Sequence, residues 1–216
     1  MQATRRMAMS FCAALAVIAT LHSSRAQDVI NLPAPETRGG LPLMETLALR
    51  RSTREFKDQP LSQQTLANLL WAAFGINRTE GEDRTAPSWR HSKETDIHVA
   101  TADGVYVYDP KANSLRRVLQ GDIRKKTSSM VFVAQAPIVL VYVADRGRMA
   151  KAPPEEQVLN AHVDSGIIAQ NVYLFAASAG LGTVILGSVD RNALAQTLAL
   201  RADQLVTFSQ PVGYPK

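Results

Sequence analysis

The sequence predicts an α+β domain in which helices pack on a mixed or antiparallel sheet. Three observations lead to this prediction. Apolar residues recur with helical spacing in residues 66–74, an Asp-Gly turn separates two short alternating runs between residues 97 and 109, and residues 138–144 form a nearly continuous β-branched apolar run. With 216 residues, of which 46% are hydrophobic, the chain suits one core and is short for two full domains.

The first 26 residues are typical of a secretory signal peptide. Arg5 and Arg6 precede an apolar stretch at residues 7–21, and a small-x-small cleavage site ends at Ala26. We therefore expect cleavage after Ala26 and an exported protein, periplasmic or secreted. The Sec route and the twin-arginine route both stay open, because the arginine pair matches the twin-arginine signal only weakly. The alternative is an N-terminal helix that is kept as a membrane anchor.

Loss of this leader changes the charge of the chain. It removes Arg5, Arg6 and Arg25 and no acidic residue, so the formal net charge of +5 becomes +2. This balance argues against a nucleic-acid partner, which needs clustered cations. No later apolar run approaches the roughly 20 residues that cross a bilayer, so we expect no membrane insertion after cleavage. Cys12 lies in the leader, and the mature chain therefore has no cysteine for a disulfide, a metal or a nucleophile.

The first part of the mature chain is predicted to contain an arm and two helices. Residues 27–42 are rich in Pro and Gly and are expected to form an extended arm. Residues 43–50 are expected to be helical. A longer amphipathic helix should begin after Ser62 as N-cap and end at Gly75, since its apolar positions are Leu66, Leu69, Leu70, Ala73 and Phe74.

The middle of the chain is predicted to be a polar loop followed by antiparallel strands. The loop covers residues 77–93. Residues 97–101 and 105–109 should form a hairpin, because Asp103-Gly104 supplies the positive φ that a tight turn needs. Residues 114–119 would continue it as a third strand.

The last part alternates strands and helices. Residues 138–144 predict a central strand that is buried on both faces. In the helix predicted at 155–179, apolar residues cover most of the circumference, which favours burial either within the domain or at a subunit interface. Gly180 should end this helix, and the remaining elements are a strand at 183–186, a helix at 191–199 capped by Asp190, and a strand at 205–212.

A group of cations follows the first predicted helix. Residues 50–54 contain three arginines and two hydroxyl groups, and in an extended segment Arg50, Ser52 and Arg54 share one face. Arginine suits bidentate phosphate binding. The segment is therefore either a phosphate site or a solvated basic turn.

Several other classes of site lack support in the sequence. His98 and His162 have no second ligand at metal spacing, so we expect no metal site. No H-E-x-x-H, G-x-S-x-G, Walker or G-x-G-x-x-G motif is present, which argues against zinc, serine-hydrolase, NTPase and Rossmann chemistry.

Four segments together resemble the nitroreductase family. They are RRSTREF at 50–56, PSWRH at 87–91, the long helix with Asp164, Gln170 and Asn171, and GLGTVILGSVD at 180–190. The SagB/ThcOx-type dehydrogenase branch is the most similar, here in an exported stand-alone form. The resemblance implies a nitroreductase-like FMN-binding domain at residues 43–216, and order along the chain matters more than any one motif.

This resemblance implies a homodimer with two FMN sites at its interface, each built from both subunits. The FMN phosphate and ribityl chain would be held by Arg50, Ser52 and Arg54, with Arg51 adjacent. A loop from the other subunit would also contact the flavin, and it maps to Pro87, Ser88, Trp89, Arg90 and His91. A second loop would run beside the isoalloxazine, and it maps to Ile185, Leu186, Gly187 and Ser188. These types fit a flavin, which needs cations, an apolar wall and backbone N–H donors.

Two residues depart from the family pattern. Trp89 replaces a small residue and would bind substrate, by stacking over the open flavin face or by narrowing the mouth of the site. His91 replaces the usual Asn and is either a proton donor or a hydrogen-bonding partner. No side chain is expected to be catalytic otherwise, because the chemistry takes place on the flavin.

The implied function is an FMN-dependent oxidoreductase with a ping-pong cycle through flavin N5. The donor would be NAD(P)H or an organic molecule, and the acceptor a nitroaromatic compound, a quinone or O₂. Two alternatives stay open: an exported flavin- or small-ligand-binding protein without turnover, and an exported structural dimer that has lost its cofactor.

Overall fold

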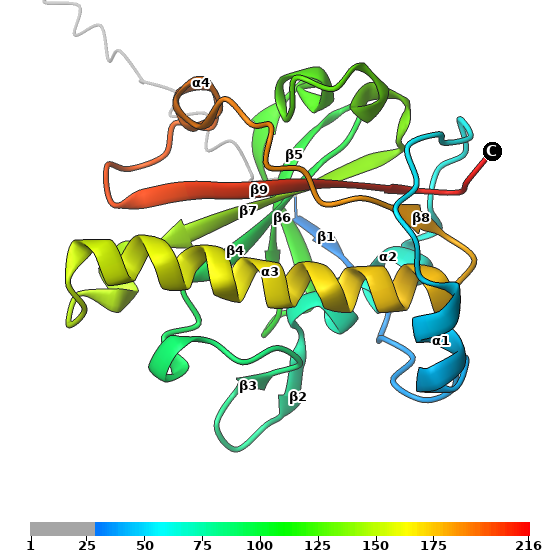
Figure 1. Ribbon diagram of the computed structural model, residues 1–216, viewed down its shortest axis with the longest axis horizontal. Coiled ribbons are helices and arrows are strands. Elements are labelled where there is room, and N and C mark those ends of the chain that lie inside the picture. Colours follow the sequence, from blue (N-terminus) through cyan, green and yellow to red (C-terminus); the bar gives the residue numbers. More distant parts are fainter. Residues whose placement is uncertain (1–28) are drawn as a thin grey trace, which may run out of the picture.

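The computed structural model describes residues 29–216 of the chain (Figure 1). The predicted signal peptide and its cleavage site lie outside the described residues. The elements in chain order are β1 (Val29–Asn31), α1 (Leu43–Leu49), α2 (Gln63–Phe74), β2 (Ile76–Arg78), β3 (Asp83–Arg84), β4 (Thr95–Ala100), β5 (Gly104–Asp109), β6 (Ser114–Gln120), β7 (Ile138–Asp145), α3 (Pro154–Ser178), β8 (Gly182–Thr183), α4 (Arg191–Thr197) and β9 (Gln204–Gly213).

A seven-stranded sheet forms the centre of the domain, in the order β1-β6-β5-β4-β7-β9-β8. Every neighbouring pair is antiparallel, so the antiparallel form of the predicted sheet is the one found. The long helix α3 runs across one face, while α4 lies on the other side of the sheet (Figure 1). The α+β prediction is confirmed.

The strand β7 separates two hydrophobic cores. All of its residues are buried, as the apolar run predicted. Because successive side chains of a strand point to opposite faces, Leu140 and Tyr142 join the core under α2 and α3, while Val139 and Val141 join the core under α4. The predicted hairpin is also present, with Val99 paired to Tyr106. The reason given for its turn was wrong, because neither Asp103 nor Gly104 has a positive φ; a Cβ at Gly104 would lie 2.5 Å from the Leu119 carbonyl oxygen, so glycine allows a close approach there instead.

The helix α2 begins and ends where the sequence predicts. The Ser62 side chain accepts a hydrogen bond of 3.0 Å from the Thr65 N–H, which satisfies one of the free donors of the first turn. Gly75 follows as C-cap. Leu69, Leu70 and Ala73 are fully buried against the sheet and α3.

The helix α3 is only partly buried. Its C-terminal half buries Ile168 and Val172 in the core. In its N-terminal half Val158, Leu159 and Val163 have 39%, 63% and 48% of their surface exposed. Within one chain, this helix is therefore not buried on most of its sides.

Three predicted elements have different bounds. The strand expected at 183–186 ends at Thr183, because the chain leaves β9 and only Leu186 pairs again, with Ser209. The helix expected at 191–199 ends at Thr197, two residues before the positive φ of Ala199. The polar loop at 77–93 contains the short hairpin β2–β3 and a 3₁₀ turn.

No helix within residues 29–216 is long and apolar enough to cross a membrane.

Candidate FMN site

The two segments of this chain that are predicted to bind FMN both contact the side chain of Tyr173. The Tyr173 hydroxyl on α3 lies 2.9 Å from Ser52 Oγ and 3.0 Å from the backbone nitrogen of Ile185. Arg50 lies over the same ring, with its Cζ 5.3 Å from the ring centroid. Tyr173 thus connects the basic segment 50–54 to the loop 185–188.

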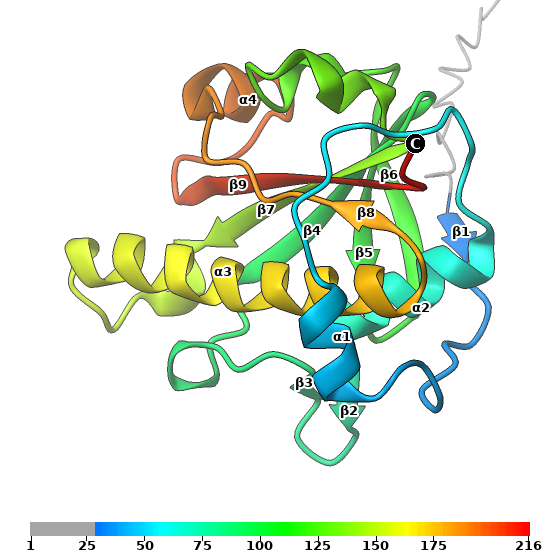
Figure 2. The same cartoon turned by 45° about the vertical axis from the view of Figure 1, so that its right-hand side comes forward.

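The backbone holds these two segments side by side as well. Ser52 forms a parallel bridge with Thr183, and the Thr53 N–H donates to the Thr183 carbonyl at 2.9 Å. A Cβ at Gly182 would lie 2.6 Å from Thr53 Cγ2, so only glycine permits this approach. Figure 2 shows the segment after α1 passing β8 on its way over the sheet.

Within residues 29–216, the arginines of the segment have no anionic partner. Arg51 and Arg54 are exposed and make no hydrogen bond or ion pair with any residue between 29 and 216. The chain end lies next to them, because Lys216 N–H donates to the Glu55 carbonyl and Phe56 pairs with Pro215. This edge of the domain therefore presents cations that are free to bind an anion.

The loop 185–188 is fixed on both sides of Gly187. Leu186 exchanges two backbone hydrogen bonds with Ser209, and Ser188 contacts Ser128 with its side chain at 3.0 Å. Within the described part of the chain, the backbone N–H groups of Gly187 and Ser188 have no acceptor. A Cβ at Gly187 would meet its nearest atom, on the Phe208 ring, at 3.9 Å, so a methyl group fits there without a clash.

These observations fit the group that the sequence predicts. FMN has a phosphate that needs cations and a ring edge that accepts hydrogen bonds. Among residues 29–216, guanidinium groups without a partner lie at one end and backbone donors without an acceptor lie beside a glycine at the other. Arg50, Arg51, Ser52 and Arg54 would hold the phosphate, and Gly187 and Ser188 would face the ring edge.

The predicted loop 87–91 lies elsewhere in the same chain. Its Trp89 N–H donates to Asp164 Oδ2 on α3 at 2.6 Å. Asp164 precedes Tyr173 by nine residues, which in an α-helix is about 13 Å along the axis and two and a half turns. The loop and the basic segment therefore contact opposite faces of α3, and one chain does not bring them together.

The side chains of this loop are largely turned to solvent. Arg90 stacks on Trp89, with its Cζ 5.0 Å from the indole centroid, and Pro87 is exposed. His91 is 83% exposed and lies 3.6 Å from Asp83 Oδ1 through its Nδ1. The Ser88 side chain accepts from the Lys93 N–H at 2.9 Å, which closes the turn.

Backbone strain marks the same turn. Arg90, His91 and Lys93 all have positive φ angles, of 44°, 58° and 49°. Residues other than glycine rarely adopt this conformation, and it persists only when the surrounding contacts hold it. Asp164 and Ser88 provide those contacts, which positions Trp89 and Arg90 on the surface.

Asp164 is a buried carboxyl group with an unusual proton affinity. Burial raises its pKa to about 6, the Trp89 N–H lowers it, and the neighbouring carboxyl of Glu94 raises it again. Glu94 is itself fully buried and accepts from the Ser92 hydroxyl at 2.6 Å. Two buried acidic side chains, Asp164 and Glu94, thus accept hydrogen bonds from residues of this turn.

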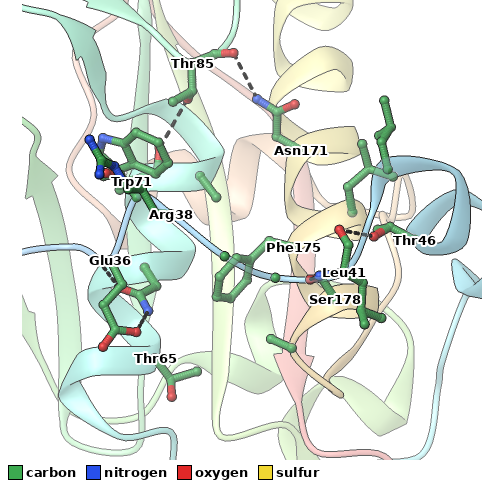
Figure 3. Close-up of a pocket in the computed structure, with 18 of the residues that line it drawn as sticks. Glu36, Arg38, Leu41, Thr46, Thr65, Trp71, Thr85, Asn171, Phe175 and Ser178 are labelled. Atoms are coloured by element: carbon green, nitrogen blue, oxygen red, sulfur yellow. Dashed lines mark hydrogen bonds between the residues drawn. The ribbon is translucent and has the colours of Figure 1, made fainter.

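A cavity of about 640 Å³ lies between residues 36–41 and the helices α1, α2 and α3 (Figure 3). Trp71, Phe175 and Ser178 line it, and none of the predicted site residues does. Asn171 also lines it and donates to the Ala73 and Thr85 carbonyls at 3.4 and 3.3 Å. Asn171 therefore links helices and loop rather than the two segments of the predicted site.

Sequence reasoning missed Tyr173. A tyrosine in a long apolar helix gives no signal by itself, because which neighbour its hydroxyl reaches depends on how segments far apart are packed. In the part of the chain that the structure describes, no group of three or more His, Cys, Asp or Glu side chains could hold a metal ion.

Comparison with known proteins identifies the family. The model of the nitroreductase family matches residues 47–214, so the chain belongs to this family. A Methanocaldococcus jannaschii protein, provisionally named a nitroreductase, is 32% identical over 196 residues, covering 86% of this chain and 97% of its own. The NADPH-flavin oxidoreductase of Vibrio harveyi is 34% identical over 80% of this chain, which spans 65% of that relative.

The fold agrees with a solved structure. A Ralstonia eutropha JMP134 protein, provisionally assigned as a nitroreductase, superposes with a TM-score of 0.84 at 44% identity. The match covers 87% of this chain and 90% of that one. The predicted nitroreductase-like fold is therefore confirmed.

Proposed function

We propose that this protein is an FMN-dependent oxidoreductase that acts on small molecules as a homodimer. The observation that supports the proposal is the junction at Tyr173, which joins the basic segment 50–54 to the loop 185–188. Arg51 and Arg54 in the first segment, and the N–H groups of Gly187 and Ser188 in the second, have no partner within residues 29–216. Membership of the nitroreductase family supports the cofactor, and so does the flavin oxidoreductase of Vibrio harveyi among the relatives.

The residues of the chain bind and orient, and none acts as a nucleophile. Arg51, Arg54 and Ser52 neutralise and hydrogen-bond the phosphate. The N–H groups of Gly187 and Ser188 bind acceptors at the ring edge and favour charge that builds up there during reduction. When bound, FMN supplies hydride and electron transfer through N5, in two half-reactions at one place.

A second copy of the chain is needed to complete the proposed site. Within one chain α3 separates the loop 87–91 from the basic segment, so the loop must come from the other subunit if it is to face the flavin. The exposed apolar side chains Val158, Leu159 and Val163 on α3 offer a surface for that contact. Trp89 and Arg90 would then border the substrate entrance. His91, which contacts Asp83, serves as a hydrogen-bonding partner.

The narrower assignment rests on the sequence. We place the protein nearest to the SagB/ThcOx-type dehydrogenases and expect export after cleavage at Ala26. NADPH is the proposed first donor to test, because the Vibrio harveyi relative is named for it. Nitroaromatic compounds, quinones and O₂ are the acceptors that the family resemblance suggests.

Absorption spectroscopy tests this function directly. The mature protein is purified, mixed with FMN, freed of excess flavin, and reduced anaerobically with NADPH before each acceptor is added. The proposal expects a yellow dimer that bleaches and regains its colour. A colourless protein would contradict flavin binding, and a flavin that no donor reduces would instead indicate a binding protein without turnover. Gel filtration of the same sample checks the dimer.

A further inference from the structure

The hydrogen bonds at Tyr173 define the direction in which each proton points. The Ile185 backbone N–H can only donate, so at 3.0 Å the phenol oxygen accepts from it. Within residues 29–216, the phenol has one other hydrogen-bond partner for its own proton, Ser52 Oγ at 2.9 Å. Since Tyr173 is buried with 8% exposure, leaving this proton without an acceptor would be costly. The phenol therefore donates to Ser52.

The direction of this hydrogen bond determines what the Ser52 hydroxyl group can donate to. A hydroxyl group that accepts from Tyr173 keeps its own proton for a different acceptor. Ser52 is exposed, and it stands between Arg51 and Arg54, which have no anionic partner within residues 29–216. Its own proton is therefore available to an anion on the side of these arginines.

We propose that Tyr173 is a positioning residue of the FMN site, which turns the Ser52 hydroxyl into a donor for the phosphate. The same phenol anchors Ile185 and so ties the phosphate end of the site to the loop beside the ring. This inference rests on the proposed function, because it requires that FMN binds between these segments.

The substitution Tyr173→Phe isolates the hydroxyl group. It keeps the buried ring and the surface on which Arg50 lies. Without the phenol proton the Ser52 hydroxyl is free to rotate and is no longer directed to the phosphate. Ile185 is half-buried, so its N–H can bind water in the variant and the loop loses less. The loss of flavin affinity should therefore come mainly from weaker binding of the phosphate.

The experiment compares FMN with riboflavin, which lacks the phosphate. Affinities of the mature wild-type protein and Tyr173→Phe are measured by flavin fluorescence quenching. We expect Tyr173→Phe to weaken FMN binding about tenfold, as for one hydrogen bond to a charged group, and riboflavin binding about twofold or less. Tyr106→Phe is the matched control, because its hydroxyl bonds Asp103 in the turn between β4 and β5 and Arg117 on β6, far from β8 in the sheet.

A double variant gives a second reading that does not depend on riboflavin. If Tyr173 acts through Ser52, Tyr173→Phe should weaken FMN binding much less in a Ser52→Ala background than in the wild type. Equal losses for FMN and riboflavin, additive losses in the double variant, or unchanged FMN affinity in Tyr173→Phe would each overturn the inference while the wild type still binds FMN. A wild type that binds no flavin would refute the proposed function, and this inference with it.

Discussion

Asp164 Oδ2 accepts a hydrogen bond of 2.6 Å from the backbone N–H of Trp89, which lies 75 residues earlier in the chain. This contact holds a turn whose backbone is strained at Arg90 and His91. The residue that fixes the proposed substrate-facing loop is therefore an acid buried beneath it, next to Glu94.

Asp164 should make the stability of the apo domain fall as the pH rises from about 4 to about 6. Its pKa in the folded state is about 6, above the ordinary value of 3.8, so the folded state holds this proton more tightly than the unfolded state does. Asp164→Asn keeps an acceptor for Trp89 and mimics the protonated acid. We expect it to remove this slope and to raise the unfolding free energy above pH 6 by about 1–3 kcal/mol.

Urea unfolding between pH 4 and pH 8 checks this expectation. Asp164→Ala is the contrasting variant, since it leaves the Trp89 N–H without an acceptor and should cost about 1–3 kcal/mol. Parallel pH curves for the wild type and Asp164→Asn would contradict the assignment.

His98 should act in the opposite direction over the same range. Burial lowers its pKa to about 4, with Asp96 raising it and Arg116 lowering it further. The unfolded state takes up the proton near pH 6.5 and the folded state does not, so stability is lost as the pH falls from about 6.5 towards 4. His98→Leu should remove up to about 3 kcal/mol of this acid sensitivity.

The substitution at His98 is favourable to test because His98 Nδ1 is buried and has no hydrogen-bond partner within residues 29–216. His91→Leu, at a largely exposed side chain, is the control. An acid transition that is the same in His98→Leu and in the wild type would show that another group determines it.

Substitutions at Gly182 and Gly187 should distinguish an effect on stability from an effect on FMN affinity. Gly182→Ala places a methyl group 2.6 Å from Thr53 and should cost about 1–3 kcal/mol of stability as overpacking, with weaker FMN binding as the two segments part. The Cβ of Gly187→Ala would make only an ordinary van der Waals contact, at 3.9 Å from Phe208, so this variant should leave the free energy of unfolding unchanged. If the flavin approaches this loop, Gly187→Ala still lowers FMN affinity; equal affinity would place the ring elsewhere.

The exposed guanidinium of Arg54 should be needed for FMN and not for the fold. Arg54→Ala removes an exposed cation that makes no hydrogen bond, ion pair or ring contact with residues 29–216, so the melting temperature of the apo protein should stay within about 2 °C. FMN affinity should fall about tenfold or more, as for loss of a charge-assisted phosphate contact. Arg78→Ala, on the exposed hairpin β2–β3, is the matched control. Unchanged flavin occupancy in Arg54→Ala would show that the phosphate lies elsewhere.

Local patterns predicted most of the elements because their causes are local. The Ser62 cap acts within one turn of where it stands. The turn at Asp103-Gly104 was predicted in the right place, although neither residue has the positive φ on which that prediction rested. The apolar run of β7 identified a strand buried on both faces without knowledge of its neighbours. The strand at 183–186 was predicted too long, because pairing with β9 stops at Thr183 and the Ile185 N–H bonds Tyr173 instead.

The sequence by itself determined which residue types are available: arginines and a serine at 50–54, a glycine at 187, and the order in which they occur. Only the tertiary structure decided that Tyr173, 121 residues after Ser52, joins them, and that α3 keeps the loop 87–91 on its other face. Periodicity reports neighbours one turn or one strand away, whereas a contact between distant segments depends on how the whole sheet and α3 pack.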